Sequence, residues 1–105
     1  MGEQEHVVAD IVDQIVRLAH PVRVLIFGSR ARCENRADSD IDVLVVVPEG
    51  APCRRLAQEL YAKINGHGIP FDLIVATPSV LRRQRRNRGL VYRRALQEGK
   101  EVYAA

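Results

Sequence analysis

The chain has 105 residues and a mass of 11.8 kDa, the size of one domain with one core, so we expect a single domain over 1–105. Its 47% apolar and 28% charged residues are typical of a soluble globular protein. No apolar run approaches the roughly 18 residues of a membrane span, and the N-terminus lacks the parts of a signal peptide. Two cysteines, Cys33 and Cys53, are too few for a zinc framework and are predicted to be reduced thiols. These features predict a cytoplasmic protein without a membrane contact.

Charge is unevenly distributed along the chain. Residues 1–78 carry eight Arg/Lys against eleven Asp/Glu, whereas residues 79–105 carry eight Arg/Lys against two Glu. Nearly all the basic residues are arginine, which binds phosphates and carboxylates with two parallel hydrogen bonds. The C-terminal quarter could therefore face an anion, a nucleic acid or an acidic partner surface.

The first half of the chain predicts one helix and two strands. Apolar residues recur over 6–19 at the spacing of one helix face, and Pro21 limits that helix. The β-branched run 22–27 predicts a buried strand that ends at Gly28. The polar segment 28–39 predicts a loop, and 41–47 a second strand that is apolar on both faces.

A second helix is predicted to start at Pro52 and to stop at Asn65-Gly66. The residues on its apolar face are Leu56, Ala57, Leu60, Tyr61 and Ile64. A third strand is predicted over 69–76.

Two helices and a tail complete the prediction. Thr77 is the expected N-cap, with Pro78 at the first position of a basic helix over 78–88. A shorter helix over 89–98 follows, and Val102 and Tyr103 form a last short strand or a packed tail. The order of elements predicts an α/β (α+β) fold, with a small mixed β-sheet flanked by helices.

Three aspartates interrupt the apolar strands. Asp40 and Asp42 open the second strand, and alternation along a strand places both on one face. Asp72 lies near the start of the third strand and can join them if the two strands are neighbours. Carboxylates that share an apolar site repel one another, and a divalent cation relieves that repulsion. Oxygen ligands without nearby His or Cys favour Mg²⁺, or Mn²⁺, over zinc.

Gly28 and Ser29 directly follow the first strand. Glycine permits a tight turn and a close approach of a ligand, and free N–H groups at a following helical turn would bind an anion. The hydroxyl of Ser29 adds a donor, and Arg30 and Arg32 add positive charge. An anion site and a metal site in one connection suit a metal-bound nucleoside triphosphate. Neither a Walker motif nor a dinucleotide-binding motif is present.

The segment FGSRARCENRADSDIDVLVVV, Phe27 to Val47, resembles the signature of the nucleotidyltransferase superfamily related to DNA polymerase β. Its pattern is Gly-Ser, ten residues, then Asp-x-Asp, with a later Asp on a neighbouring strand. The length and the C-terminal sequence are similar to those of the minimal nucleotidyltransferases of bacteria and archaea. One departure is Cys33, which stands where these proteins have glycine and removes no ligand.

The resemblance implies a polymerase β-like fold and a specific reaction. Asp40 and Asp42 would hold two Mg²⁺ ions, and Asp72 would bind the catalytic ion and help to deprotonate an acceptor hydroxyl. Gly28, Ser29 and, as a further contact, Arg30 would bind the phosphates of ATP. The hydroxyl would then attack the α-phosphorus, and pyrophosphate would leave. Two metal ions about 3.5–4 Å apart can stabilise both the attacking and the leaving oxygen.

Many minimal nucleotidyltransferases are paired with a HEPN-domain protein, a small helical RNase, and act as its antitoxin. In some pairs the antitoxin transfers AMP to a tyrosine of the toxin. The resemblance thus implies a HEPN partner, and the small size predicts that another chain, a partner or a second copy, supplies the acceptor surface. Two alternatives remain: a small-molecule acceptor, as in antibiotic-modifying relatives, and a non-catalytic antitoxin that acts by binding alone.

The arginine run from Arg82 to Arg88 spreads around a helix and does not form one stripe. A solvated surface and a partner-binding surface both fit this pattern. Direct nucleic-acid binding is the less favoured interpretation, because no aromatic residue lies between Phe71 and Tyr92 to stack on bases.

Overall fold

Four strands form one mixed sheet in the computed structural model, which describes residues 3–27, 41–68, 70–86 and 99–105. The strands are β1 (Arg23–Phe27), β2 (Ile41–Val46), β3 (Phe71–Ala76) and β4 (Lys100–Ala104), in the order β3-β2-β1-β4. The pairs β1–β2 and β1–β4 are antiparallel, and β2–β3 is parallel. The predicted mixed sheet is confirmed, and residues 102–103 belong to a strand.

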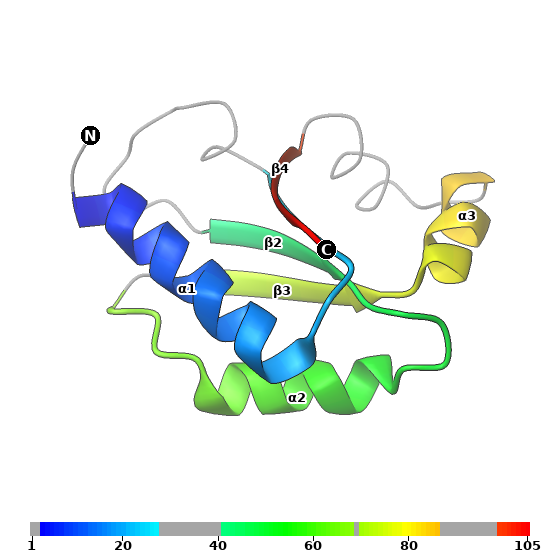
Figure 1. The fold of residues 1–105 in the computed structure, drawn as a ribbon, viewed down its shortest axis with the longest axis horizontal. Helices are drawn as coiled ribbons and strands as arrows, with labels where there is room; N and C mark the ends of the chain where they lie inside the picture. Colours follow the sequence, from blue (N-terminus) through cyan, green and yellow to red (C-terminus); the bar gives the residue numbers. More distant parts are fainter. Residues whose placement is uncertain (1–2, 28–40, 69, 87–98) are drawn as a thin grey trace.

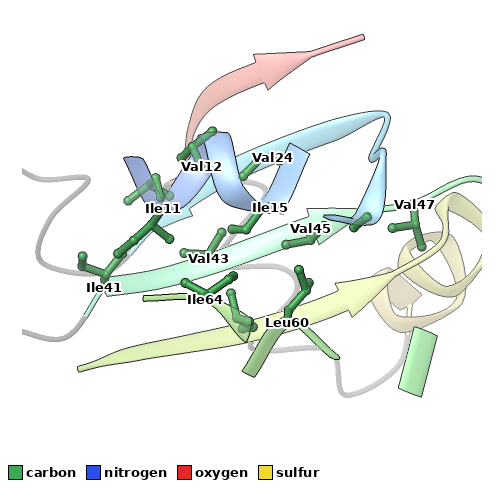
Figure 2. Close-up of a cluster of buried hydrophobic side chains, with 13 residues drawn as sticks. Ile11, Val12, Ile15, Val24, Ile41, Val43, Val45, Val47, Leu60 and Ile64 are labelled. Carbon is green, nitrogen blue, oxygen red and sulfur yellow. The ribbon is translucent and has the colours of Figure 1, made fainter. Parts of the chain in front are cut away.

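Two helices cover one face of this sheet. They are α1 (Glu3–Ala19) and α2 (Cys53–Lys63), and both lie on the same side of β2 and β3 (Figure 1). Because β2 and β3 are parallel, the connection between them must return along the sheet, and α2 makes that crossover. Side chains from both helices meet alternate residues of the strands in the main core (Figure 2). The fully buried members of this core include Ile11, Ile15, Val24, Ile41, Val43, Val45 and Leu60.

The third helix, α3 (Pro78–Arg86), follows β3 and packs against the opposite face. Alternation along the strands gives that face a second, smaller apolar cluster. Its buried members are Leu25, Phe27, Leu44, Val46, Ala76 and Leu81.

Local sequence signals explain most of the element ends. The Oγ1 of Thr77 accepts the N–H of Val80 at 3.3 Å, so Thr77 caps α3 and Pro78 occupies its first position, as predicted. Helix α2 ends differently from the expectation of a glycine stop, because Ile64 adopts an extended conformation (φ −75°, ψ 131°). The left-handed positions come later, at His67 (φ 56°) and Gly68 (φ 80°), where the chain turns towards β3. The predicted loop over 28–39 and the helix over 89–98 lie outside the described residues.

Candidate active site

Asp42 and Asp72 lie side by side on neighbouring parallel strands. The register pairs Asp42 of β2 with Asp72 of β3, so both side chains project from the same face of the sheet. This is the face opposite to α1 and α2, because the adjacent residues Ile41, Val43 and Leu73 all contribute to the main core. Asp42 is half-buried and Asp72 is exposed. The predicted proximity of these two aspartates is therefore confirmed.

The end of β1 lies beside the same carboxylates. Phe27, the last residue of β1, pairs with Asp42 across the antiparallel β1–β2 ladder. The chain therefore leaves β1 and enters β2 at the end of the sheet that carries the two aspartates. Gly28, Ser29, Arg30 and Asp40 belong to the intervening segment and lie outside the described residues. The structure thus shows where Asp42 and Asp72 lie, and the catalytic, metal-binding and nucleotide-binding roles of all six residues stay predictions.

The aspartates occupy one end of a face whose centre is apolar. Leu44 is fully buried two residues after Asp42, on the same face, and it belongs to the second cluster. Leu81 of α3 packs into that cluster near the other end of the strands, with Ala76. The carboxylates thus border apolar packing, and a bound cation would relieve the repulsion between two neighbouring carboxylates.

Asp42 and Asp72 offer a metal ion only oxygen ligands. Carboxylates from β2 and β3 match the hard ligands that Mg²⁺ and Mn²⁺ prefer. Within residues 6–27, 41–68, 70–83 and 99–105, no three His, Cys, Asp or Glu side chains gather as a metal site. The third predicted ligand, Asp40, is outside those ranges. Cys53 is a free cysteine, and Cys33 lies outside the described residues.

A carboxylate from the β2–α2 connection caps α3, which the sequence did not indicate. Glu49 accepts the N–H of Ser79 at 2.8 Å and its hydroxyl at 2.7 Å. The hydrogen bond from the Ser79 hydroxyl is the main cause that lowers the pKa of Glu49. Arg82 approaches the same carboxylate at 3.7 Å. This contact fixes the first turn of α3, while Arg82 and Arg83 stay exposed.

The α2–β3 connection is tied to α1 by a second polar contact. Gln14 donates to the carbonyl of Asn65 at 3.1 Å and accepts its N–H at 2.9 Å. The ring of His67 lies 2.7 Å from the carboxylate of Asp10, and this hydrogen bond lowers the pKa of Asp10. His67 is exposed, and it braces the connection that leads to Asp72.

Tyr61 was predicted on the apolar face of α2, but 47% of it is exposed. The reason is its position at the free edge of the sheet, where its hydroxyl accepts the N–H of Leu73 at 2.7 Å. Its ring stacks on Phe71, with centroids 5.8 Å apart. Helical spacing placed Tyr61 on the apolar face of the helix, but it contained no signal for a hydrogen bond to a strand.

The mixed sheet, with two aspartates in register on the face opposite α1 and α2, has the architecture of a nucleotidyltransferase domain. The family model of the nucleotidyltransferase domain matches residues 7–100. The chain therefore belongs to the nucleotidyltransferase domain family. A search of curated proteins gave no match. No helix in the described ranges is long and apolar enough to cross a bilayer.

Solved structures share this fold. A toxin–antitoxin crystallised with AMP-PNP has a TM-score of 0.56 and 19% identity, over 90% of this chain and 72% of that chain. A mutant of the toxin–antitoxin MntA-HpeT has a TM-score of 0.56 and 17% identity, over 90% and 70% of the two chains. A protein of Sulfolobus solfataricus, provisionally named a nucleotidyltransferase, has a TM-score of 0.55 and 27% identity, over 74% and 70%.

Proposed function

We propose that the chain transfers AMP from ATP to an acceptor hydroxyl, with release of pyrophosphate and with Mg²⁺ as the cofactor. The observation that carries this proposal is the register of Asp42 with Asp72, beside the end of β1. Membership of the nucleotidyltransferase domain family supports the class of reaction. One of the similar toxin–antitoxin structures was crystallised with AMP-PNP, which supports an adenine nucleotide as the substrate.

Three carboxylates would hold the metal ions: Asp40 and Asp42 at the start of β2, and Asp72 on β3. The pair on adjacent strands fits two Mg²⁺ ions, or Mn²⁺, because both side chains offer only oxygen and share one face. When bound, these ions would supply neutralisation of the phosphate charge and would stabilise the attacking and leaving oxygens.

The chain's own residues would bind and orient the substrates. Gly28 and Ser29, directly after β1, would donate hydrogen bonds to the β- and γ-phosphates, and Arg30 would add positive charge. Asp72 is exposed and would take the proton of the acceptor hydroxyl. The acceptor oxygen would form a bond to the α-phosphorus as the bond from that phosphorus to pyrophosphate breaks.

The acceptor we propose is a toxin partner, a helical RNase of the HEPN class, with this chain as its cytoplasmic antitoxin. Two of the similar structures are named toxin–antitoxin, which supports a partner of this kind. The exposed arginines Arg82 and Arg83 on α3 offer a basic surface to such a partner. A second polypeptide would also supply the acceptor surface that a chain of this size lacks.

Label transfer from [α-³²P]ATP with Mg²⁺ tests the proposal, in the presence and absence of the protein encoded by the adjacent gene. Asp42→Asn removes a proposed ligand. Asp13→Asn is the matched control, because Asp13 is an exposed carboxylate on α1 that pairs with Arg17. We expect label on the partner with wild type and with Asp13→Asn, and none with Asp42→Asn. Partner neutralisation without any labelling, and unchanged by Asp42→Asn, would refute catalysis and indicate an antitoxin that acts by binding alone.

A further inference from the structure

Asp72 lies on an edge strand, where fewer contacts fix the position of the backbone. In the sheet of the described strands, β3 pairs with β2 alone. The carbonyls of Pro70 and Ala76 accept the N–H groups of Ile41 at 3.0 Å and Val47 at 2.9 Å. Backbone groups alternate in direction along a strand, so residues between these two with odd numbers present theirs to the outer edge. Only every second residue of such an edge strand forms backbone hydrogen bonds with a neighbouring strand.

Tyr61 contacts this outer edge at both residues that flank Asp72. Its hydroxyl accepts the N–H of Leu73 at 2.7 Å, with the carbonyl of the same residue at 3.5 Å. Its ring stacks on Phe71 at a centroid distance of 5.8 Å and an interplanar angle of 12°. One side chain from α2 thus holds the residue before and the residue after the aspartate.

Packing alone does not account for a tyrosine at this position. Tyr61 is 47% exposed and lies outside both buried clusters. A phenylalanine would keep the ring stack, so the hydroxyl adds only its bond to the edge backbone. The hydroxyl therefore supplies a contact with the strand that packing of the ring alone does not supply.

The two neighbouring carboxylates explain why the edge of β3 needs an additional contact. Like charges directly opposite each other on neighbouring strands are destabilising. Strand β2 is held on both sides by β1 and β3, whereas β3 is held on one side by a strand. Any displacement that separates Asp42 from Asp72 would therefore occur at β3. The Tyr61 contact opposes it on the free side.

We propose that Tyr61 is a positioning residue for Asp72: it holds the outer edge of β3 so that the Asp72 carboxylate stays opposite Asp42, ready for a shared divalent cation. This inference rests on the proposed function, since it assigns the two aspartates to one metal site. It adds a residue that does not touch the metal or the nucleotide and acts through the backbone of its neighbours.

The test measures Mn²⁺ binding directly, through the electron paramagnetic resonance signal of the free ion, at a temperature where each variant is folded. Tyr61→Phe removes the hydroxyl and keeps the ring. Tyr103→Phe is the matched control, because Tyr103 lies on β4, at the other edge of the sheet. We expect Tyr61→Phe to weaken Mn²⁺ binding about two- to tenfold, the usual effect of one hydrogen bond. Tyr103→Phe should bind Mn²⁺ as the wild type does.

Two further measurements separate positioning from a general loss of stability. Amide hydrogen exchange at Leu73 should accelerate in Tyr61→Phe, and excess Mn²⁺ should restore kcat of the transfer reaction. Phe71→Leu removes the ring stack, keeps the hydroxyl, and should also weaken Mn²⁺ binding. If Tyr61→Phe fails to fold, Phe71→Leu carries the same test.

The outcomes distinguish this inference from the proposed function. If wild type binds Mn²⁺, Asp42→Asn does not, and Tyr61→Phe binds as tightly as wild type, the positioning role is wrong and the metal site stands. If neither wild type nor Asp42→Asn binds Mn²⁺, the proposed function is wrong, and the positioning role, which depends on it, is wrong as well.

Discussion

Leu44 is the residue through which the packing of the carboxylate-bearing face can be tested. It is fully buried at the centre of β2, two residues after Asp42, and belongs to the cluster with Leu25 and Phe27. Leu44→Ala leaves a cavity beneath that face, which costs about 2–5 kcal/mol of unfolding free energy. With an unfolding entropy of about 2.1 cal/mol/K per residue, a chain of 105 residues loses about 4–5 °C per kcal/mol. We therefore expect the Tm to fall by roughly 10–20 °C.

Urea denaturation followed by circular dichroism gives the free energy directly, with thermal unfolding as a second reading. Val102→Ala is the matched control, because Val102 is a strand residue that is 37% exposed. We expect the unfolding free energy of Val102→Ala to lie within about 0.5 kcal/mol of the wild-type value. A loss below about 1 kcal/mol for Leu44→Ala would refute the burial of this face, because no well-packed leucine is removed so cheaply.

Two polar contacts give further predictions. Because the pKa of Glu49 is lowered in the folded protein, its contact with Ser79 stabilises the fold above about pH 4.3, the ordinary pKa of a glutamate. That stabilisation is lost as the pH falls through the lowered pKa, so the Tm advantage of wild type over Glu49→Gln should shrink below that pH; a constant difference would contradict the assignment. Gln14→Ala removes both hydrogen bonds to the Asn65 backbone and should cost about 1 kcal/mol in urea denaturation. An unchanged midpoint would show that this contact does not brace the α2–β3 connection.

Local patterns in the sequence predicted the elements well. Apolar spacing predicted α1 and the limit at Pro21, and the Thr77-Pro78 pair predicted the start of α3. The two aspartates could be placed together, on the condition that their strands are neighbours, because each lies near the start of an apolar strand; the structure meets that condition. These signals are local, since period, caps and strand position all depend on residues close in sequence.

What the sequence could not predict depends on contacts between distant residues. The order β3-β2-β1-β4 puts β3 at an edge, and only that position explains why Tyr61 is half-exposed and bonded to Leu73. The capping of α3 by Glu49 joins residues 30 positions apart. Such contacts follow from the assembled fold and leave no periodic pattern in the chain.

The pairing of β1 with β4 has a consequence for how the protein folds. Strand β1 joins β2 through one hairpin connection, but its other neighbour begins only at Lys100, which pairs with Ile26. Closing so long a segment costs more chain entropy than forming the hairpin, so β4 is expected to add late in folding. Until then β1 is itself a free edge, and its run of buried aliphatic residues is open to pairing with other chains. The yield of native protein should therefore depend on how quickly β4 pairs with β1.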